Sequence, residues 1–178
     1  MRIAGKAKVD EIQDESDAVS LCSLYAGSET FGIDTSKIRE VLGERDLQQV
    51  PMSPTFIAGV VPYRGEVLTT VNLRALLGVE AHSGRSCVLV MEDDKAAERF
   101  GLVVDAVGGV VVVSQSALEE NPCTLEARGK WLFDGAYKME SGLMIRLDPQ
   151  KLSPSRLSET GLFRKNSNGG ADASLDRG

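Results

Sequence analysis

The chain has 178 residues, a net charge of −6 at pH 7 and an apolar content of 42%. A chain of this length and content can bury a core of its own without a disulfide or a structural metal. The negative charge argues against sequence-independent binding to nucleic-acid phosphates, because no cluster of Lys and Arg offsets it.

Both ends have the composition of tails. Residues 1–17 are polar and acidic and lack the apolar run of a signal peptide. Residues 153–178 are rich in Ser, Gly, Asn and charge, with too few apolar residues to order themselves. We therefore expect flexible tails at 1–17 and 153–178 and a folded part at 18–152.

Between the tails, short β-rich runs follow one another with turn signals between them. In chain order the runs are VSLCSLYA, KIREVL, FIAGVV, EVLTTVNL, SCVLVM, RFGLVV, GGVVVVS, WLFDGAYKM and GLMIRL. The segment LRALLGV after Asn72 predicts a short helix, and SPTFIAG predicts one capped turn at Ser53. Roughly nine or ten short strands with so few helices predict an all-β fold, either barrels or a sandwich.

Two pairs of segments resemble each other within the chain. ETFGIDTSKIREV (29–41) matches ERFGLVVDAVGGV (98–110), and GVVPYRGEVLTTVN (59–72) matches GAYKMESGLMIRLD (135–148). Two matches in the same order predict two similar β-halves, the second beginning at about residue 85, each of which closes its own small sheet. The alternative, that short strands resemble one another by pattern alone, stays open.

Residues typical of catalysis or metal binding are scattered. His82 is the one histidine, and the cysteines Cys22, Cys87 and Cys123 are far apart in the sequence. The chain lacks zinc-ligand spacing, a Cys-x-x-Cys pair, a phosphate-binding loop and a nucleophile elbow. We expect a protein of the reducing cytoplasm that is not an enzyme and binds no cofactor and no metal.

The segment Tyr63-Arg64-Gly65-Glu66 separates two apolar runs, and Arg64 stands at this break beside a glycine that can take positive φ. Arg64 is either an exposed turn residue or a group offered to a partner. The runs GGVVVVSQS and FIAGVVPY are more continuous than strict alternation requires. Such runs are buried on both faces or covered by another protein.

The order of these motifs resembles one family. IREVLG, followed by VPMSPTFIAGVVPYRGEVLTTVNLRALLGV, RFGLVVDAVGGVVVVSQSAL and GAYKMESGLMIRLDPQKL, is similar to the CheW family of chemotaxis coupling proteins. The resemblance covers about residues 18–152. It implies two pseudo-repeated, five-stranded SH3-like β-barrels packed around a shared hydrophobic core, with few short helices. Pro62-Tyr63 and Asn72 depart from the family's usual residues.

The resemblance also implies a function. Members are non-enzymatic adaptors that couple chemoreceptors to a CheA-type histidine kinase. The partners would be the cytoplasmic tip of a chemoreceptor and the kinase's regulatory domain. The protein would then be cytoplasmic and associated with membrane-anchored receptor arrays. The longest apolar run is far below the roughly 20 residues of a membrane span, so we expect no direct membrane insertion.

Carried over onto matching positions, the family's receptor groove lies between the two barrels. It would comprise Ile38, Glu40, Gly59, Arg64, Val88, Val104, Val107 and Val110. The apolar members would cover the apolar stripe of a receptor helix. Glu40 and Arg64 would supply charge complementarity that fixes the register of the complex more than it adds affinity.

Two other functions remain open. The chain could be a CheW-like scaffold of a non-flagellar chemosensory pathway. It could also be an SH3- or OB-like β-module that binds nucleic acid. The net charge of −6 and an aromatic content of 5% argue against nucleic acid as a partner.

Overall fold

The computed structural model describes residues 15–80, 83–95, 97–121 and 127–163. Ten strands lie in these ranges: β1 (Ala18–Ala26), β2 (Glu29–Asp34), β3 (Ile38–Gly43), β4 (Ile57–Tyr63), β5 (Glu66–Asn72), β6 (Cys87–Asp93), β7 (Glu98–Val104), β8 (Ala106–Ser114), β9 (Phe133–Met139) and β10 (Gly142–Leu147). The helices are α1 (Leu73–Leu77), α2 (Ala127–Leu132) and α3 (Pro154–Thr160), and 3₁₀ turns occur at η1 (Glu15–Asp17), η2 (Thr35–Lys37), η3 (Gln115–Ala117) and η4 (Pro149–Lys151).

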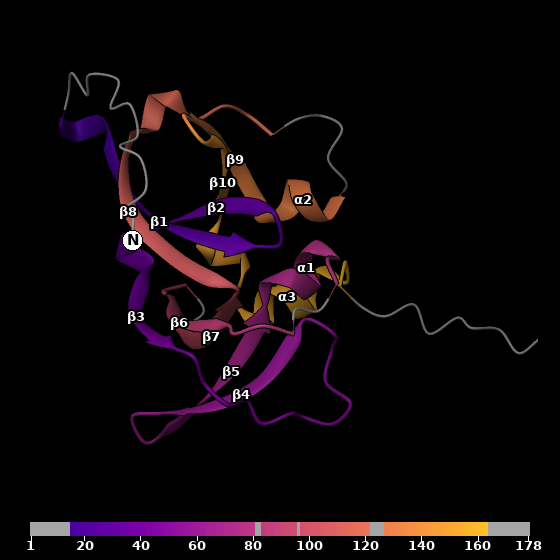
Figure 1. Ribbon diagram of the computed structural model, residues 1–178. Helices are drawn as coiled ribbons and strands as arrows, with labels where there is room; N and C mark the ends of the chain where they lie inside the picture. The colour runs from indigo at the N-terminus through magenta and orange to yellow at the C-terminus, as the bar shows by residue number, and fades with distance from the viewer. Residues whose placement is uncertain (1–14, 81–82, 96, 122–126, 164–178) are drawn as a thin grey trace, which may run out of the picture.

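The strands form two five-stranded sheets, which Figure 1 shows as an upper and a lower lobe. The first sheet has the order β8-β1-β2-β10-β9, and the second has the order β3-β6-β7-β5-β4. We call them the first and the second lobe. The predicted all-β class with two five-stranded units is confirmed.

The internal repeat is also confirmed, because equivalent residues have equivalent partners in the two sheets. In the second sheet β5 runs parallel to β7, with Thr70 opposite Gly101. In the first sheet β10 runs parallel to β2, with Arg146 opposite Gly32. These pairs are the ones that the two sequence matches superimpose.

The predicted division into halves at about residue 85 is wrong. The second lobe contains β3 to β7, one continuous stretch of chain, whereas the first lobe combines β1 and β2 with β8 to β10. The reason is that each repeat crosses to the other sheet after its second strand. The crossings lie at Thr35–Lys37 and at the single residue Asp105.

A glycine stands at the same place in each lobe and lets the sheet curl. The segment after β3 bridges β4 through Gln48 and Val60, and the segment after β8 bridges β9 through Glu119 and Ala136. Gly59 and Gly135 precede these bridges, with φ of 144° and 157°. A Cβ at these glycines would lie 2.6 Å from the Gln48 carbonyl oxygen and 2.3 Å from that of Glu119. The bridges connect the opposite edges of each sheet, which is the arrangement expected of a barrel.

The main hydrophobic core lies between the lobes, as expected of a shared core. It joins Phe31 of β2 to Phe100 of β7 and includes Leu76 of α1 and Leu157 of α3. Each lobe also has a small interior cluster of its own. These clusters are centred on Leu21, Tyr137 and Met144 in the first lobe and on Val61, Leu68 and Val90 in the second.

The expected flexible tail from residue 153 is wrong for residues 153–163. Phe163 is only 3% exposed, and its ring meets Phe56 and Trp131 edge-on at centroid distances of 6.1 Å. The boundary was misplaced because these apolar side chains find partners far away in sequence. Residues 164–178 lie outside the described residues.

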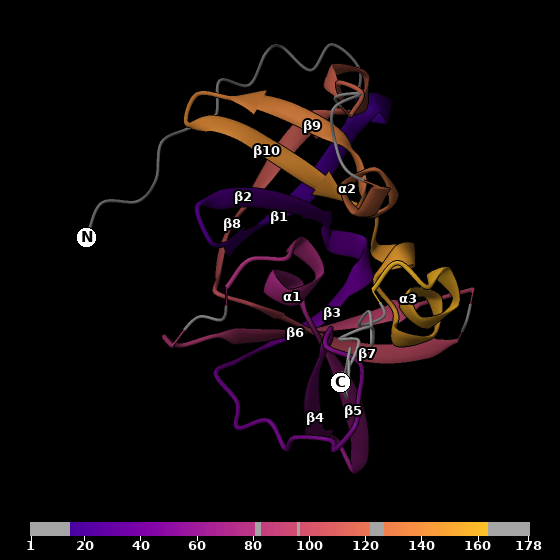
Figure 2. The ribbon, with the colours of Figure 1, turned by 90° about the vertical axis from the view of Figure 1, so that its right-hand side faces the viewer.

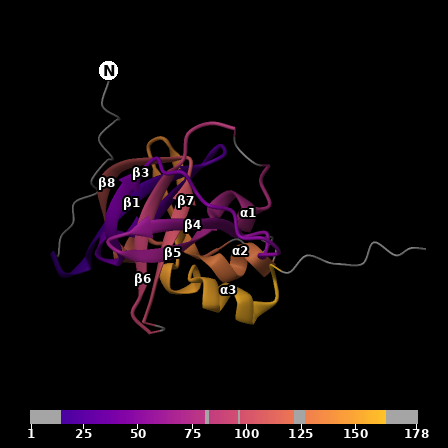
Figure 3. The same cartoon turned by 90° about the horizontal axis from the view of Figure 1, so that it is seen from below.

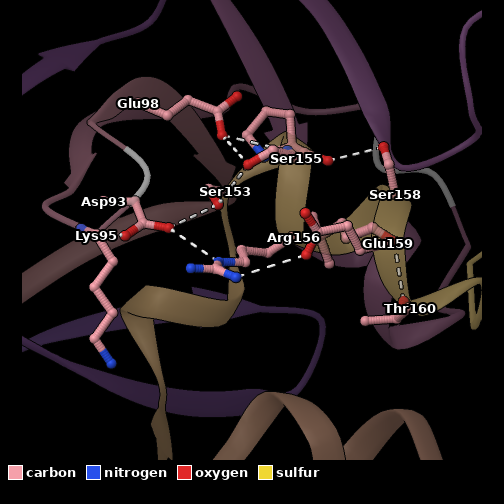
Figure 4. A network of polar contacts seen from close by, with 11 residues as sticks. Asp93, Lys95, Glu98, Ser153, Ser155, Arg156, Ser158, Glu159 and Thr160 are labelled. Atoms are coloured by element: carbon pink, nitrogen blue, oxygen red, sulfur yellow. Dashed lines mark hydrogen bonds and ion pairs between the residues drawn. The ribbon is translucent and has the colours of Figure 1, made fainter.

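Polar contacts also hold α3 to the turn between β6 and β7 (Figure 4). The Ser153 hydroxyl donates to the buried Asp93 carboxylate at 3.1 Å, and Arg156 Nε lies 3.7 Å from the same group. The amide and hydroxyl of Ser155 donate to Glu98. The helix therefore belongs to the folded part of the chain.

At the other end, residues 1–14 lie outside the described residues. Asp17, which was expected to lie in the tail, accepts hydrogen bonds from the hydroxyls of Ser114 and Ser116. The helices α1, α2 and α3 gather on one side of the molecule, which faces the viewer in Figure 2. Figures 1 and 3 show β3 and β8 on the opposite side.

Candidate partner-binding surface

Three polar side chains from two strands and a turn form a cluster at the β4–β5 turn. Arg64 Nη2 donates to Glu40 Oε2 at 2.9 Å, and Tyr63 Oη donates to the same oxygen at 2.9 Å. The Arg64 guanidinium lies 5.3 Å from the centre of the Tyr63 ring. Since Arg64 remains 73% exposed, its charge is held in place yet open to a partner.

The backbone at Arg64 has an unfavourable conformation for its residue type. Arg64 and Gly65 have φ of 48° and 81°, as in the two-residue turns of tight hairpins that favour Asn or Gly first. A left-handed conformation costs a residue with a Cβ about 1–2 kcal/mol. Such outliers concentrate at functional sites, which makes this turn a candidate for partner binding.

The cluster changes the acidity of its members. The hydrogen bond from Tyr63, followed by that from Arg64, holds the pKa of Glu40 below its ordinary value. The same carboxylate raises the pKa of Arg64 by accepting its hydrogen bond. Partial burial, followed by the bond to Glu40, raises the pKa of Tyr63. Glu40 therefore stays ionised and Tyr63 stays protonated over the physiological pH range.

The remaining expected site residues divide into exposed and buried ones. Val110 on β8 is 62% exposed, whereas Ile38 on β3 and Val107 on β8 are partly buried against the main core. Val88 and Val104 are only 1% and 2% exposed. These two valines cannot touch a partner in this conformation, because β6 and β7 are buried on both faces.

Gly59 is also buried, and its role is the close backbone approach to Gln48. Of the eight expected residues, Ile38, Glu40, Arg64, Val107 and Val110 remain accessible in part or in full. Glu40 and Arg64 are in direct contact. Ile38 lies on β3, and Val107 and Val110 lie on β8. Both are edge strands, on the side away from the helices (Figure 3).

Sequence reasoning missed two exposed valines on these edge strands. Val41 on β3 is 46% exposed and Val112 on β8 is 43% exposed. Val41 matches Val110 in the internal repeat, so the repeat itself could have identified it. We call Ile38, Glu40, Val41, Arg64, Val107, Val110 and Val112 the edge-strand surface.

Among the described residues, no group of three or more His, Cys, Asp or Glu side chains could hold a metal ion. In the same part of the chain, no helix is both long and apolar enough to cross a membrane. His82 and Cys123 lie outside the described residues.

The fold and the edge-strand surface define a class: an all-β protein of two interwoven repeats with exposed apolar and charged groups on its edge strands. A family model described as a CheW-like domain matches residues 21–156. The chain belongs to this family.

Relatives and a solved structure agree with the family match. Chemotaxis protein CheW of Treponema pallidum is 25% identical over 76% of this chain and 82% of its own length. Chemotaxis protein CheW of Klebsiella aerogenes is 24% identical over 86% of this chain and 92% of its own length. The crystal structure of scaffolding protein TtCheW from Thermoanaerobacter tengcongensis has the same fold, with a TM-score of 0.67 and 21% identity over 75% of this chain and 91% of that chain.

Proposed function

We propose that the protein is a non-enzymatic chemotaxis adaptor that couples chemoreceptors to a CheA-type histidine kinase. The family match spans most of the folded part, and relatives of similar length are named chemotaxis proteins. The adaptor acts in the cytoplasm at membrane-anchored receptor arrays. It binds the cytoplasmic tip of a receptor and the regulatory domain of the kinase at separate surfaces.

The observation that carries the receptor half of the proposal is the strained, prepositioned Arg64. Its guanidinium is fixed by Glu40 and Tyr63 but keeps most of its surface. A fixed guanidinium loses little freedom when it pairs with a carboxylate or with carbonyl groups at a helix end. A receptor tip is a helical hairpin, and its polar ends and apolar stripe suit such a cation beside exposed valines.

The apolar part of the receptor contact is supplied by the edge strands. Val110, Val112 and Val41 are exposed, and Ile38 and Val107 join them to the main core. Valines supported by a core present a stiff apolar surface, because β-branched side chains have few rotamers. The buried Val104 belongs to the core against which Ile38 and Val107 pack.

The test is an NMR titration of the isotope-labelled protein with two ligands, each added separately. One is a receptor-tip hairpin and the other is a kinase regulatory domain, both from the same genome. We expect the hairpin to shift signals of Glu40, Arg64 and Val110, and the kinase domain to shift a different set. If neither ligand shifts any signal of the folded protein, the adaptor proposal is wrong.

A further inference from the structure

A largely buried ion pair lies at the second crossing between the lobes. Asp105 is the single residue that joins β7 of the second lobe to β8 of the first. Arg74 of α1 donates two hydrogen bonds of 2.7 Å to the Asp105 carboxylate, from Nε to Oδ1 and from Nη2 to Oδ2. Both side chains are 16% exposed. Such bidentate pairs are strong and geometrically specific.

The Asp105 carboxylate also accepts a hydrogen bond from the first lobe. The amide of Gly27, in the turn between β1 and β2, donates to Asp105 Oδ2 at 2.8 Å. The amide of Asp105 donates to the Tyr25 carbonyl at 2.9 Å. Arg74 adds a bond from Nη1 to the Glu80 carbonyl at 2.7 Å. One carboxylate thus joins the crossing, the helix that follows β5, and the first hairpin of the opposite lobe.

The other crossing is built differently. The repeat places Ser36 and Gln150 where Asp105 and Arg74 stand, and these two residues cannot form an ion pair. That crossing is a 3₁₀ turn, in which Asp34 accepts from the Ser36 amide. Lys37 of that turn forms an ion pair with Asp94, but the Asp94 side chain is 65% exposed and the contact is not bidentate. Of the two crossings, the one that leads into β8 therefore has the bidentate, largely buried pair.

Each crossing leads directly into one half of the edge-strand surface. Ile38 and Glu40 follow the first crossing on β3, and Val107 and Val110 follow Asp105 on β8. The two halves belong to different lobes, so their relative placement depends on the angle between the lobes. Any turn of β8 at Asp105 moves Val107 and Val110 relative to Glu40.

We propose that Asp105 and Arg74 are a positioning pair that fixes the angle between the lobes and thereby the spacing of the two halves of the receptor surface. The receptor part of this inference rests on the proposed function. The lobe-angle part stands on the contacts alone. Neither residue belongs to the edge-strand surface, so their effect on a receptor is exerted through geometry.

The experiment compares Asp105→Asn, which keeps the shape and removes the charge, with Arg74→Lys, which keeps the charge and removes the planar fork. The control is Lys138→Ala, which breaks the exposed pair between Lys138 and Glu119 within the first lobe. Residual dipolar couplings of backbone amides give the relative orientation of the two lobes. The amide-proton shift of Gly27 reports the hydrogen bond to Asp105, and titration with the receptor-tip hairpin gives affinity.

In Asp105→Asn we expect the Gly27 signal to move upfield and the couplings of the two lobes to stop fitting one rigid orientation. Receptor affinity should fall by about fivefold or more, the lower end of coupling between separate sites. Arg74→Lys should give the same changes at smaller size, and Lys138→Ala should give none. If Asp105→Asn fails to fold, Arg74→Lys decides the question through the same readouts.

Unchanged lobe orientation in the folded variants overturns the positioning pair. A changed orientation with unchanged receptor affinity overturns its role in the receptor surface. If the hairpin does not bind the unaltered protein, the proposed function fails, while the couplings still decide whether the pair sets the lobe angle.

Discussion

Val41 and Val110 occupy the same position in the two interwoven repeats. Val41 on β3 lies opposite Leu89 of β6, and Val110 on β8 lies opposite Cys22 of β1. Both side chains are exposed although both strands begin at the main core. The pair therefore gives each lobe one exposed apolar group on an edge strand.

The first prediction concerns these two valines. Val41→Asp and Val110→Asp should each weaken receptor binding by about 2 kcal/mol, because they bury a charge in an apolar contact. Their melting temperatures should change little, since both side chains are exposed. The control is Met52→Asp, at a fully exposed methionine in the loop before β4. Isothermal titration with the hairpin measures the effect, and equal affinity in all three variants would contradict the edge-strand surface.

The second prediction separates strain from function at the β4–β5 turn. Arg64→Gly should raise the free energy of unfolding by up to about 1 kcal/mol, because glycine tolerates positive φ and the exposed ion pair with Glu40 contributes little. The same change should weaken receptor binding. Chemical denaturation and hairpin titration measure the two effects. A marked loss of stability would mean that Arg64 serves the fold.

The third prediction concerns acidity within the cluster. The pKa of Glu40 is depressed in the folded protein. The contacts of Glu40 therefore stabilise the fold at any pH above 4.5, the ordinary pKa of a glutamate. That contribution is lost as the pH falls through the lower, folded value. Tyr63→Phe removes the main cause, so the Glu40 carboxyl should titrate at a higher pH. Carbon-13 NMR of the carboxyl follows this directly, and an identical midpoint in both proteins would refute the hydrogen bond.

The fourth prediction concerns the paired glycines. Gly59→Ala and Gly135→Ala should each destabilise the fold by about 1–3 kcal/mol, because a Cβ would meet a carbonyl and the positive φ would be strained. Gly109→Ala is the matched control, since a Cβ there meets nothing within 4 Å. Thermal unfolding compares the three. Similar melting temperatures would show that the backbone at Gln48 and Glu119 can move enough to accommodate the added Cβ.

The fifth prediction concerns the C-terminal segment. Phe163→Ala should cost about 3–5 kcal/mol, as expected for truncation of a buried aromatic side chain. Ser158→Ala, on the exposed side of α3, should cost little. Denaturant unfolding measures both. If Phe163→Ala leaves the free energy of unfolding unchanged, the segment that ends at Phe163 is a tail, as the sequence suggested.

The sequence predicted the class of fold and the repeat because both depend on local patterns. Short apolar runs separated by turn residues indicate strands, and the matches around Phe31 and Phe100 survive in the register of the sheets. The exchange of strands between lobes could not be predicted, because it depends on the backbone geometry of two short crossings, Thr35–Lys37 and Asp105. Periodicity within each strand is the same whichever sheet the strand joins.

The candidate site was predicted less well. A match to a family motif gives a position in the chain but not the direction of its side chain, and Val88 and Val104 point into the core. Arg64 and Glu40 were expected on one surface, but their contact with each other and the bond from Tyr63 to Glu40 were not predicted, because these depend on how β3 and β4 meet. Phe163 was misjudged because its partners, Phe56 and Trp131, are far away in sequence.

The continuous second lobe has a consequence for the order in which the protein is made. Strands β3 to β7 are synthesised one after another, so that sheet has all of its strands once residue 104 has been added. The β1–β2 hairpin is made first, yet its neighbours β8 and β10 follow only after residues 35–105. During that interval the hairpin has two open edges, the condition under which strands pair wrongly with other chains. The lobe that begins the chain is the last to be completed on the ribosome.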